Sequence, residues 1–167
     1  SGIDNTVIVY EKPVYFVRGQ DIEYFSIATP FQLLVAHVGH ATPTHITVGA
    51  VRTLYEESPA QIASIFTRIG RLTNIARQAI ENGDIQQLGP LMNKNHHLLQ
   101  QLTVSDNRLD EFCRVAVENG AAGAKLSGGG RGGNMIALVT DDTRQAVEDA
   151  LRNLQAKHLI HTTVQQN

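Results

Sequence analysis

The first part of the chain has the short apolar runs that are typical of β-strands. Residues 6–10 and 14–17 flank Glu11-Lys12-Pro13, which predicts a hairpin. Residues 22–27 alternate loosely between apolar and polar positions until Thr29-Pro30. The apolar run over residues 31–36 predicts a central strand that ends by Gly39.

The middle of the chain changes to the apolar period of helices, with apolar positions three and four residues apart. Capping signals divide it into four helices. They are expected over residues 44–57 with Thr44 as N-cap, from Ser58-Pro59 to Asn82-Gly83, over residues 84–102, and from Ser105-Asp106 to Asn119-Gly120.

The last part returns to strands around one further helix. Strands are expected over residues 124–126, 135–139 and 158–164, and a helix over residues 141–156. Strands that bracket a block of helices predict an α+β fold, with an antiparallel sheet and helices packed on one face. The 167 residues are enough for one compact domain with its own core.

Composition and charge narrow the function classes. With 42% hydrophobic residues and a net charge of -2, the chain resembles an ordinary globular protein, and nothing favours nucleic acid or an anionic membrane surface as a partner. No apolar run is long enough to span a bilayer. The single cysteine, Cys113, lies on the apolar stripe of a helix, so we expect a core thiol in a cytoplasmic protein.

A glycine-rich segment over residues 121–134 is the most informative motif. It reads AAGAKLSGGGRGGN and runs directly into the apolar residues 135–139. Glycine lets the backbone approach a phosphate closely, and successive free N–H groups form a concave anion site. A flexible linker is the alternative, but linkers rarely precede a buried strand directly. The motif therefore predicts phosphate binding.

Several histidines raise the question of a metal site. Three of them, His37, His40 and His45, are close in sequence, and His96 and His97 are adjacent. No carboxylate or cysteine recurs with them at ligand spacing. We expect satisfied or exposed histidines and no metal site.

Residues 123–138, GAKLSGGGRGGNMIAL, resemble the third conserved motif of the GHMP small-molecule kinases, in the form found in mevalonate kinases. Three further segments resemble that subfamily in the same order along the chain: Ser1-Gly2-Ile3-Asp4, residues 39–51 and residues 92–105. The resemblance covers nearly the whole chain. It implies the ferredoxin-like C-terminal domain of a two-domain kinase.

The resemblance also implies what the chain does not contain. Residues 1–30 would lead from an N-terminal domain, and residues 31–167 would form the C-terminal domain. No segment resembles the N-terminal lysine or the main ATP loop of the family. ATP and Mg²⁺ would be bound mainly by the missing N-terminal half, and this chain alone would be inactive. Mevalonate or a similar alcohol would be the substrate. A second copy of the chain, in a homodimer, is a further candidate partner.

Site residues follow from the matched motif positions. By resemblance, Asp4 is the catalytic carboxylate and the loop residues bind phosphate, while Thr44 and Ser127 contact the substrate. A plain turn at Asp4 and a plain helix N-cap at Thr44 are the structural alternatives. Lys125 receives no role, since a lysine ahead of the loop could simply form a surface salt bridge. The loop residues are Gly128, Gly129, Gly130, Arg131 and Gly132.

Four positions depart from the family pattern. Arg131 and Thr103 replace glycines, Val38 replaces a threonine near the acceptor pocket, and Asn134 replaces a cysteine. A guanidinium at position 131 would either add a phosphate contact or turn to solvent. The expected function is the C-terminal domain of an ATP-dependent mevalonate kinase. The alternatives are phosphomevalonate kinase, another GHMP kinase, or a non-catalytic binding or dimerisation module.

Overall fold

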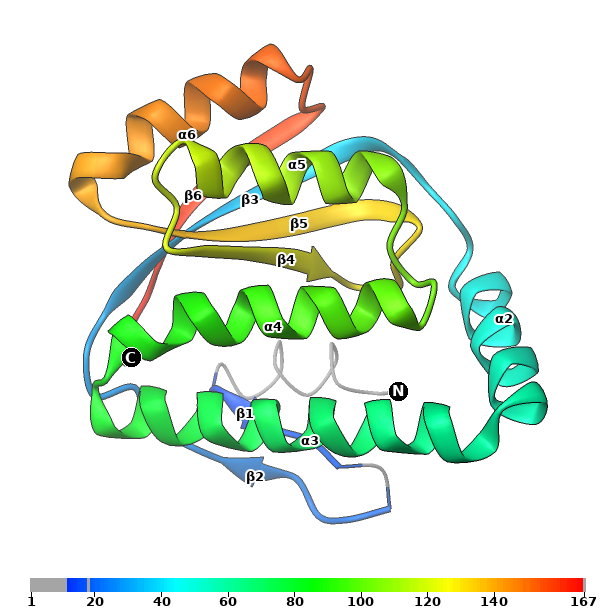
Figure 1. Cartoon of the computed structure of the whole chain (residues 1–167). Helices are drawn as coiled ribbons and strands as arrows, with labels where there is room; N and C mark the ends of the chain where they lie inside the picture. Colours follow the sequence, from blue (N-terminus) through cyan, green and yellow to red (C-terminus); the bar gives the residue numbers. More distant parts are fainter. Residues whose placement is uncertain (1–11, 18, 167) are drawn as a thin grey trace.

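A four-stranded antiparallel sheet organises the computed structural model, which describes residues 12–17 and 19–166 (Figure 1). The strand order is β4-β5-β3-β6. The strands are β3 (Phe31–Ala41), β4 (Gly123–Ser127), β5 (Gly132–Val139) and β6 (His158–Val164). Because β3 pairs with both β5 and β6, the first long strand of the chain becomes a central one, as its apolar pattern predicts.

Helices occupy one face of this sheet, one of its edges and one of its ends (Figure 1). In Figure 1, α5 and α6 lie across one face, α4 runs beside β4, α3 lies beyond α4, and α2 stands at the end of the layer. Their bounds are α2 Thr44–Glu57, α3 Pro59–Asn82, α4 Leu88–Gln101, α5 Asn107–Glu118 and α6 Asp141–Asn153. The predicted α+β class with an antiparallel sheet is confirmed.

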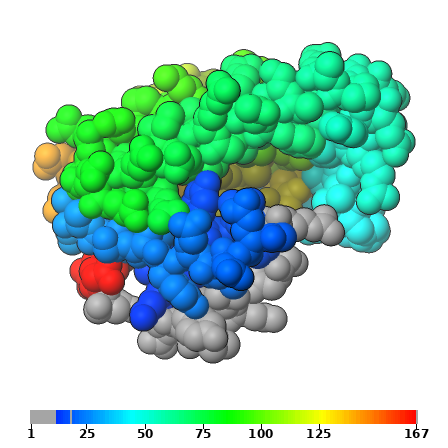
Figure 2. Space-filling model, turned by 90° about the horizontal axis from the view of Figure 1, so that it is seen from below, coloured from blue at the N-terminus to red at the C-terminus, as the bar shows by residue number. Residues whose placement is uncertain are grey.

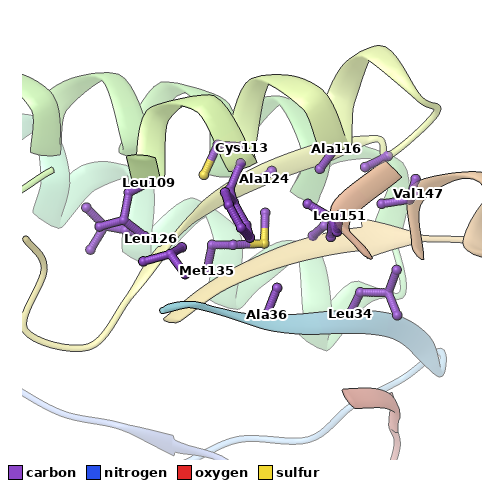
Figure 3. Close-up of a cluster of buried hydrophobic side chains, with 14 of the residues drawn as sticks. Leu34, Ala36, Leu109, Cys113, Ala116, Ala124, Leu126, Met135, Val147 and Leu151 are labelled. Carbon is purple, nitrogen blue, oxygen red and sulfur yellow. The ribbon is translucent and has the colours of Figure 1, made fainter. Parts of the chain in front are cut away.

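The main core fills the space between the sheet and α5 and α6 (Figure 3). Alternate residues of β3 and β5 point into it, as expected for strands with one buried face. Leu109, Phe112 and Cys113 of α5 meet them, so the predicted core thiol is confirmed. Burial raises the pKa of the Cys113 thiol to about 12, which keeps the thiol protonated and inert.

The free edge of β4 is covered by α4. The side chain of Asn93 accepts a hydrogen bond from the Ala124 N–H at 2.9 Å, and His96 Nδ1 accepts one from the Leu126 N–H at 3.3 Å. These two contacts satisfy backbone donors that an edge strand otherwise exposes. The helix therefore covers the edge of the sheet and fixes the position of the strand that leads into the glycine loop.

Most element ends fall where the capping signals predict them. Gly83 ends α3 with φ 76°, and the Asp106 carboxylate caps α5. Several predictions need adjustment. Thr44 is the first residue of α2 and not its N-cap, which is Pro43, and no side chain caps this helix. The helix expected to reach residue 156 ends at Asn153. The helix expected from residue 84 begins with a 3₁₀ turn at Ile85–Gln87 before α4, and β3 continues to Ala41. The extension of β3 includes a register shift between His37 and Ala41.

The described part of the N-terminal region contains a hairpin that the sequence analysis did not predict. The strand β1 (Val14–Tyr15) pairs with β2 (Glu23–Tyr24) in a separate two-stranded sheet. Residues 6–10, the predicted partner of residues 14–17, lie outside the described residues. Arg77 of α3 holds this small sheet through an ion pair to Glu23 at 2.7 Å and a ring contact with Tyr15. None of the described helices has the length and hydropathy that a membrane span requires.

Candidate functional site

A cavity of about 570 Å³ lies where β4 leads into the glycine loop. Residues from α2, α3, α4, β4 and the loop line it. Figure 2 shows a hollow between α2 and α3, with atoms of the segment around residue 125 at its bottom. Its volume lies in the range of small-molecule sites. Three segments far apart in sequence therefore meet at one site: the start of α2, the middle of α4 and the glycine loop.

The glycine loop combines one open position with several crowded ones. Gly128 has φ +94°, and a Cβ placed there would meet no atom within 4 Å. A Cβ on Gly129 would lie 2.7 Å from Thr44 Oγ1, and one on Gly130 would lie 2.0 Å from the Val104 carbonyl oxygen. The loop is thus packed against α2 and the α4–α5 connection while its tip stays accessible. An accessible glycine backbone beside a cavity fits the phosphate oxygens of a nucleotide.

Hydroxyl groups from two segments line the same cavity. Thr44 begins α2 and Ser127 ends β4, and both face this space together with Gly128 and Gly129. The two proposed substrate residues are therefore brought together by the fold. Thr47, one turn after Thr44, also lines the cavity. It is buried, and its Oγ1 has no hydrogen-bond partner among the described residues.

Lys125 is the residue whose environment differs most from the sequence-based interpretation. It lines the cavity, is partly buried and donates from Nζ to the Leu126 carbonyl oxygen at 2.7 Å. Burial lowers the pKa of its ammonium group. Among the described residues Lys125 forms no ion pair, so the surface salt bridge that the sequence allowed is not seen there. Alternation along β4 places Lys125 on the same face as Ser127, a signal that the sequence already contained.

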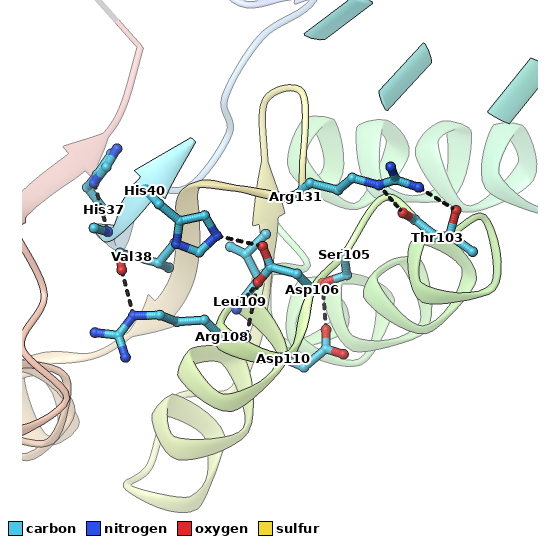
Figure 4. A network of polar contacts seen from close by, with 11 residues as sticks. His37, Val38, His40, Thr103, Ser105, Asp106, Arg108, Leu109, Asp110 and Arg131 are labelled. Atoms are coloured by element: carbon cyan, nitrogen blue, oxygen red, sulfur yellow. Dashed lines mark hydrogen bonds and ion pairs between the residues drawn. The ribbon is translucent and has the colours of Figure 1, made fainter. Parts of the chain in front are cut away.

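Arg131 lies outside this cavity. Its Nε donates to the Thr103 carbonyl oxygen at 2.9 Å and its Nη2 to Thr103 Oγ1 at 3.1 Å (Figure 4). The guanidinium therefore contacts the α4–α5 connection and does not turn freely to solvent. Val38 points into the main core and does not line the cavity, and Asn134 is exposed on β5.

The family described as GHMP kinases C terminal matches residues 76–157, from the end of α3 to the start of the last strand. That stretch contains β4, the glycine loop and β5. The chain carries a GHMP kinase C-terminal domain.

Individual relatives give the same result. The chain is 37% identical to a mevalonate kinase from Pyrococcus abyssi over 150 residues, 87% of this chain and 44% of that protein. It is 36% identical to the Pyrococcus furiosus mevalonate kinase, covering 91% of this chain and 46% of the relative. The GHMP domain is thus homologous to the C-terminal half of mevalonate kinases. The chain spans about half the length of these curated relatives.

A solved structure agrees in detail. The L. major mevalonate kinase in complex with R-mevalonate superposes with a TM-score of 0.90 at 33% identity. The superposition covers 99% of this chain and 53% of the other. Since nearly every residue of this chain has a counterpart there, the fold of the GHMP domain is that of the C-terminal half of this kinase.

A polar network fixes the base of the glycine loop in the GHMP domain (Figure 4). Asp106 caps α5 through Oδ1 and contacts His40 Nε2 through Oδ2 at 2.9 Å. A Cβ on Gly132 would lie 2.5 Å from the His40 carbonyl oxygen, so the end of the loop rests directly on this residue. Arg108 donates to the Val38 carbonyl oxygen at 2.7 Å, which ties α5 to the end of β3.

The structure adds little to two sequence-based predictions, the catalytic role of Asp4 and the roles of the histidines. Asp4 lies outside the described residues, so its catalytic role stays a prediction. His40 pairs with Asp106, and His96 is buried between α4, β4 and α5. The described part of the chain holds no group of three His, Cys, Asp or Glu side chains arranged to bind a metal ion.

Proposed function

We propose that the chain is the C-terminal half of an ATP-dependent mevalonate kinase, a cytoplasmic enzyme that phosphorylates the primary 5-hydroxyl of mevalonate. One observation carries the proposal: the glycine loop, Thr44, Ser127 and Lys125 converge on one cavity in a domain homologous to mevalonate kinases. ATP would supply the phosphoryl group and Mg²⁺ would neutralise its charge, both held mainly by the half that this chain does not span.

Each residue of this chain has a definite task in the proposal. The Gly128 backbone approaches the phosphates, since nothing within 4 Å occupies the side-chain position there. Thr44, Ser127 and the unpaired hydroxyl of Thr47 offer hydrogen bonds to the polar groups of the acceptor. Asp4 accepts the proton of the acceptor hydroxyl as it attacks. Gly129, Gly130 and Gly132 hold the loop in place, and Arg131 fixes it from outside through Thr103.

In this proposal, Lys125 makes the site selective for an acceptor that carries a negative charge. Mevalonate carries a carboxylate, and Lys125 is a partly buried cation without a carboxylate partner among the described residues. A cation desolvated by burial gains more from a ligand carboxylate than an exposed one, because the surrounding dielectric is low. Neutral acceptors of other GHMP kinases lack the group that this contact would hold.

The test measures ADP release by the protein that contains both halves, with mevalonate as acceptor. Lys125→Met is expected to raise the KM for mevalonate about tenfold or more with little change in kcat, because a charge-assisted hydrogen bond is lost. Lys125→Arg should recover part of the affinity. The comparison variant Asp4→Asn should instead lower kcat by about 10²-fold or more.

The control and the alternatives separate the possible outcomes. Arg114→Gln removes an exposed cation that pairs with Glu118 and should leave both constants unchanged. An unchanged KM in Lys125→Met would refute the role of Lys125. Turnover of phosphomevalonate in place of mevalonate would identify the alternative kinase. Binding of mevalonate without any turnover would identify a non-catalytic module.

A further inference from the structure

A second cavity, which no part of the proposed function uses, lies between α3 and α4. Its volume is about 580 Å³, and it shares no lining residue with the candidate site. The two helices lie side by side across the molecule, as Figure 1 shows. One short segment of each helix, residues 68–72 of α3 and residues 93–98 of α4, supplies its lining. The lining residues are Arg68, Arg71, Leu72, Asn93, Lys94, His97 and Leu98.

The rim of this α3–α4 groove is cationic on both sides. Arg68 and Arg71 are three residues apart on α3, and Lys94 and His97 have the same spacing on α4. This spacing puts each pair on one helix face. All four side chains are exposed, so they are free to turn toward a ligand in the groove.

These cations lack the carboxylates that usually neutralise surface charge. Within the described residues, Arg68, Arg71 and Lys94 take part in no ion pair. The only acidic residue of α3 is Glu81, which pairs with Arg77, and α4 has no acidic residue at all. The concentration of unpaired positive charge occurs in a chain whose net charge is -2. It is therefore a local feature and not a consequence of overall basicity.

The floor of the groove is apolar and recessed. Leu98 is 2% exposed and Leu72 is partly buried, and both line the groove below the charged rim. An anion with an apolar part would bury that part against the leucines while its charge meets the arginines. Guanidinium groups bind phosphate oxygens in a bidentate manner, which favours phosphate over a single carboxylate.

We propose that the α3–α4 groove binds a soluble organic phosphate that carries an apolar chain, with Arg68, Arg71 and Lys94 on the phosphate and Leu72 and Leu98 on the chain. A membrane surface fits less well, because no large apolar side chain of the groove is exposed enough to insert into a bilayer. The proposal does not depend on the kinase function, since the residues belong to a different cavity.

Titration calorimetry with octyl phosphate on the 167-residue chain tests the site. We expect saturable one-to-one binding, and about tenfold weaker binding of inorganic phosphate, because it lacks the apolar chain. Arg68→Gln with Arg71→Gln should weaken octyl phosphate binding about tenfold or more. Lys94→Gln should weaken it by a smaller factor. The matched control Arg114→Gln, an exposed helical arginine outside the groove, should change it less than about twofold.

The other outcomes overturn the proposal. Absence of saturable binding, or equal binding by the double variant and the unaltered chain, would exclude the groove as the phosphate site. Equal affinity for inorganic phosphate and octyl phosphate would show that the apolar floor of the groove does not contribute to binding and would contradict the proposal. Binding to phosphatidylserine vesicles that is stronger than binding to octyl phosphate, and that is lost in the double variant, would assign the groove to a membrane surface instead.

Discussion

Two residues that replace family glycines, Thr103 and Arg131, contact each other in the structure. Both have positive φ, 56° and 51°, the left-handed region in which glycine is normally preferred. Thr103 follows the end of α4, and its N–H donates to the Gln100 carbonyl oxygen while the Val104 N–H donates to Leu99. This is the hydrogen-bond pattern of a helix C-terminus that usually contains glycine. The two departures from the family pattern are therefore one local feature, joined by the Arg131 guanidinium.

A variant at Thr103 tests this view at the residue scale. Thr103→Gly is expected to raise the free energy of unfolding by about 1 kcal/mol, because a β-branched residue in the left-handed region is strained by about that amount. The exposed hydrogen bond from Arg131 contributes less than this strain. Thr103→Ala keeps a Cβ and loses the hydroxyl, so it should not stabilise. Urea denaturation measures both variants, and a Thr103→Gly protein less stable than the unaltered chain would contradict the strain argument.

At the scale of elements, α4 determines the position of β4 and of the loop that follows. Gly89 of α4 and Gly123 of β4 meet backbone to backbone, so that a Cβ on Gly123 would lie 2.1 Å from the Gly89 carbonyl oxygen. Asn93 and His96 then bind the edge of β4 further along the same helix. Because of this contact, Lys125 and Ser127 line the cavity beside α4 and α3.

Two Gly→Ala variants in neighbouring helices should have opposite effects. Gly89→Ala places a methyl group 2.3 Å from the Ala122 carbonyl oxygen, and we expect a loss of about 2–3 kcal/mol of unfolding free energy. Gly70→Ala in α3 meets no atom within 4 Å and should add about 0.5–1 kcal/mol, because alanine favours the helix. Thermal unfolding of both variants measures the difference. Equal melting temperatures would show that α4 does not approach β4 this closely.

At the scale of the whole molecule, His96 connects α4, β4 and α5. Its Nδ1 accepts the Leu126 N–H, and its Nε2 lies 3.1 Å from Asp110 Oδ1. Burial lowers the pKa of His96, and the nearby Asp110 carboxylate opposes the shift. The folded protein therefore holds the imidazole neutral at a pH at which the unfolded chain, with its ordinary pKa of 6.5, already binds a proton.

This difference gives stability a defined pH dependence. Since the unfolded chain binds the proton more readily, the free energy of unfolding should fall as the pH drops below about 7, by at most about 1.4 kcal/mol per pH unit from this residue. His96→Gln keeps an acceptor for Leu126 and should flatten the decline between about pH 7 and pH 5. Urea denaturation at several pH values measures the slope. His45→Gln, at an exposed position, is the control and should leave the slope unchanged.

Much of the local structure could be predicted because its determinants are neighbours in the chain. The αL glycine at Gly83, the Asp106 cap and the apolar period of α3 each act within a few residues, so the helix ends fall where expected. The glycine loop was recognisable for the same reason. Strand pairing was harder to predict: β3 pairs with β5 and β6, which lie about a hundred residues further along the chain, and no local signal identifies these partners.

The sequence by itself determined the fold class, many of the helix ends and the position of the glycine loop, because periodicity, capping and glycine content are local properties of the chain. Only the tertiary structure decided which side chains share a site with that loop. The packing of α3 and α4 against β4 places Lys125 beside the loop, and the packing of α2 against the loop brings Thr44 and Thr47 to it. The unpaired cations of the α3–α4 groove also become a cluster only when the two helices pack side by side.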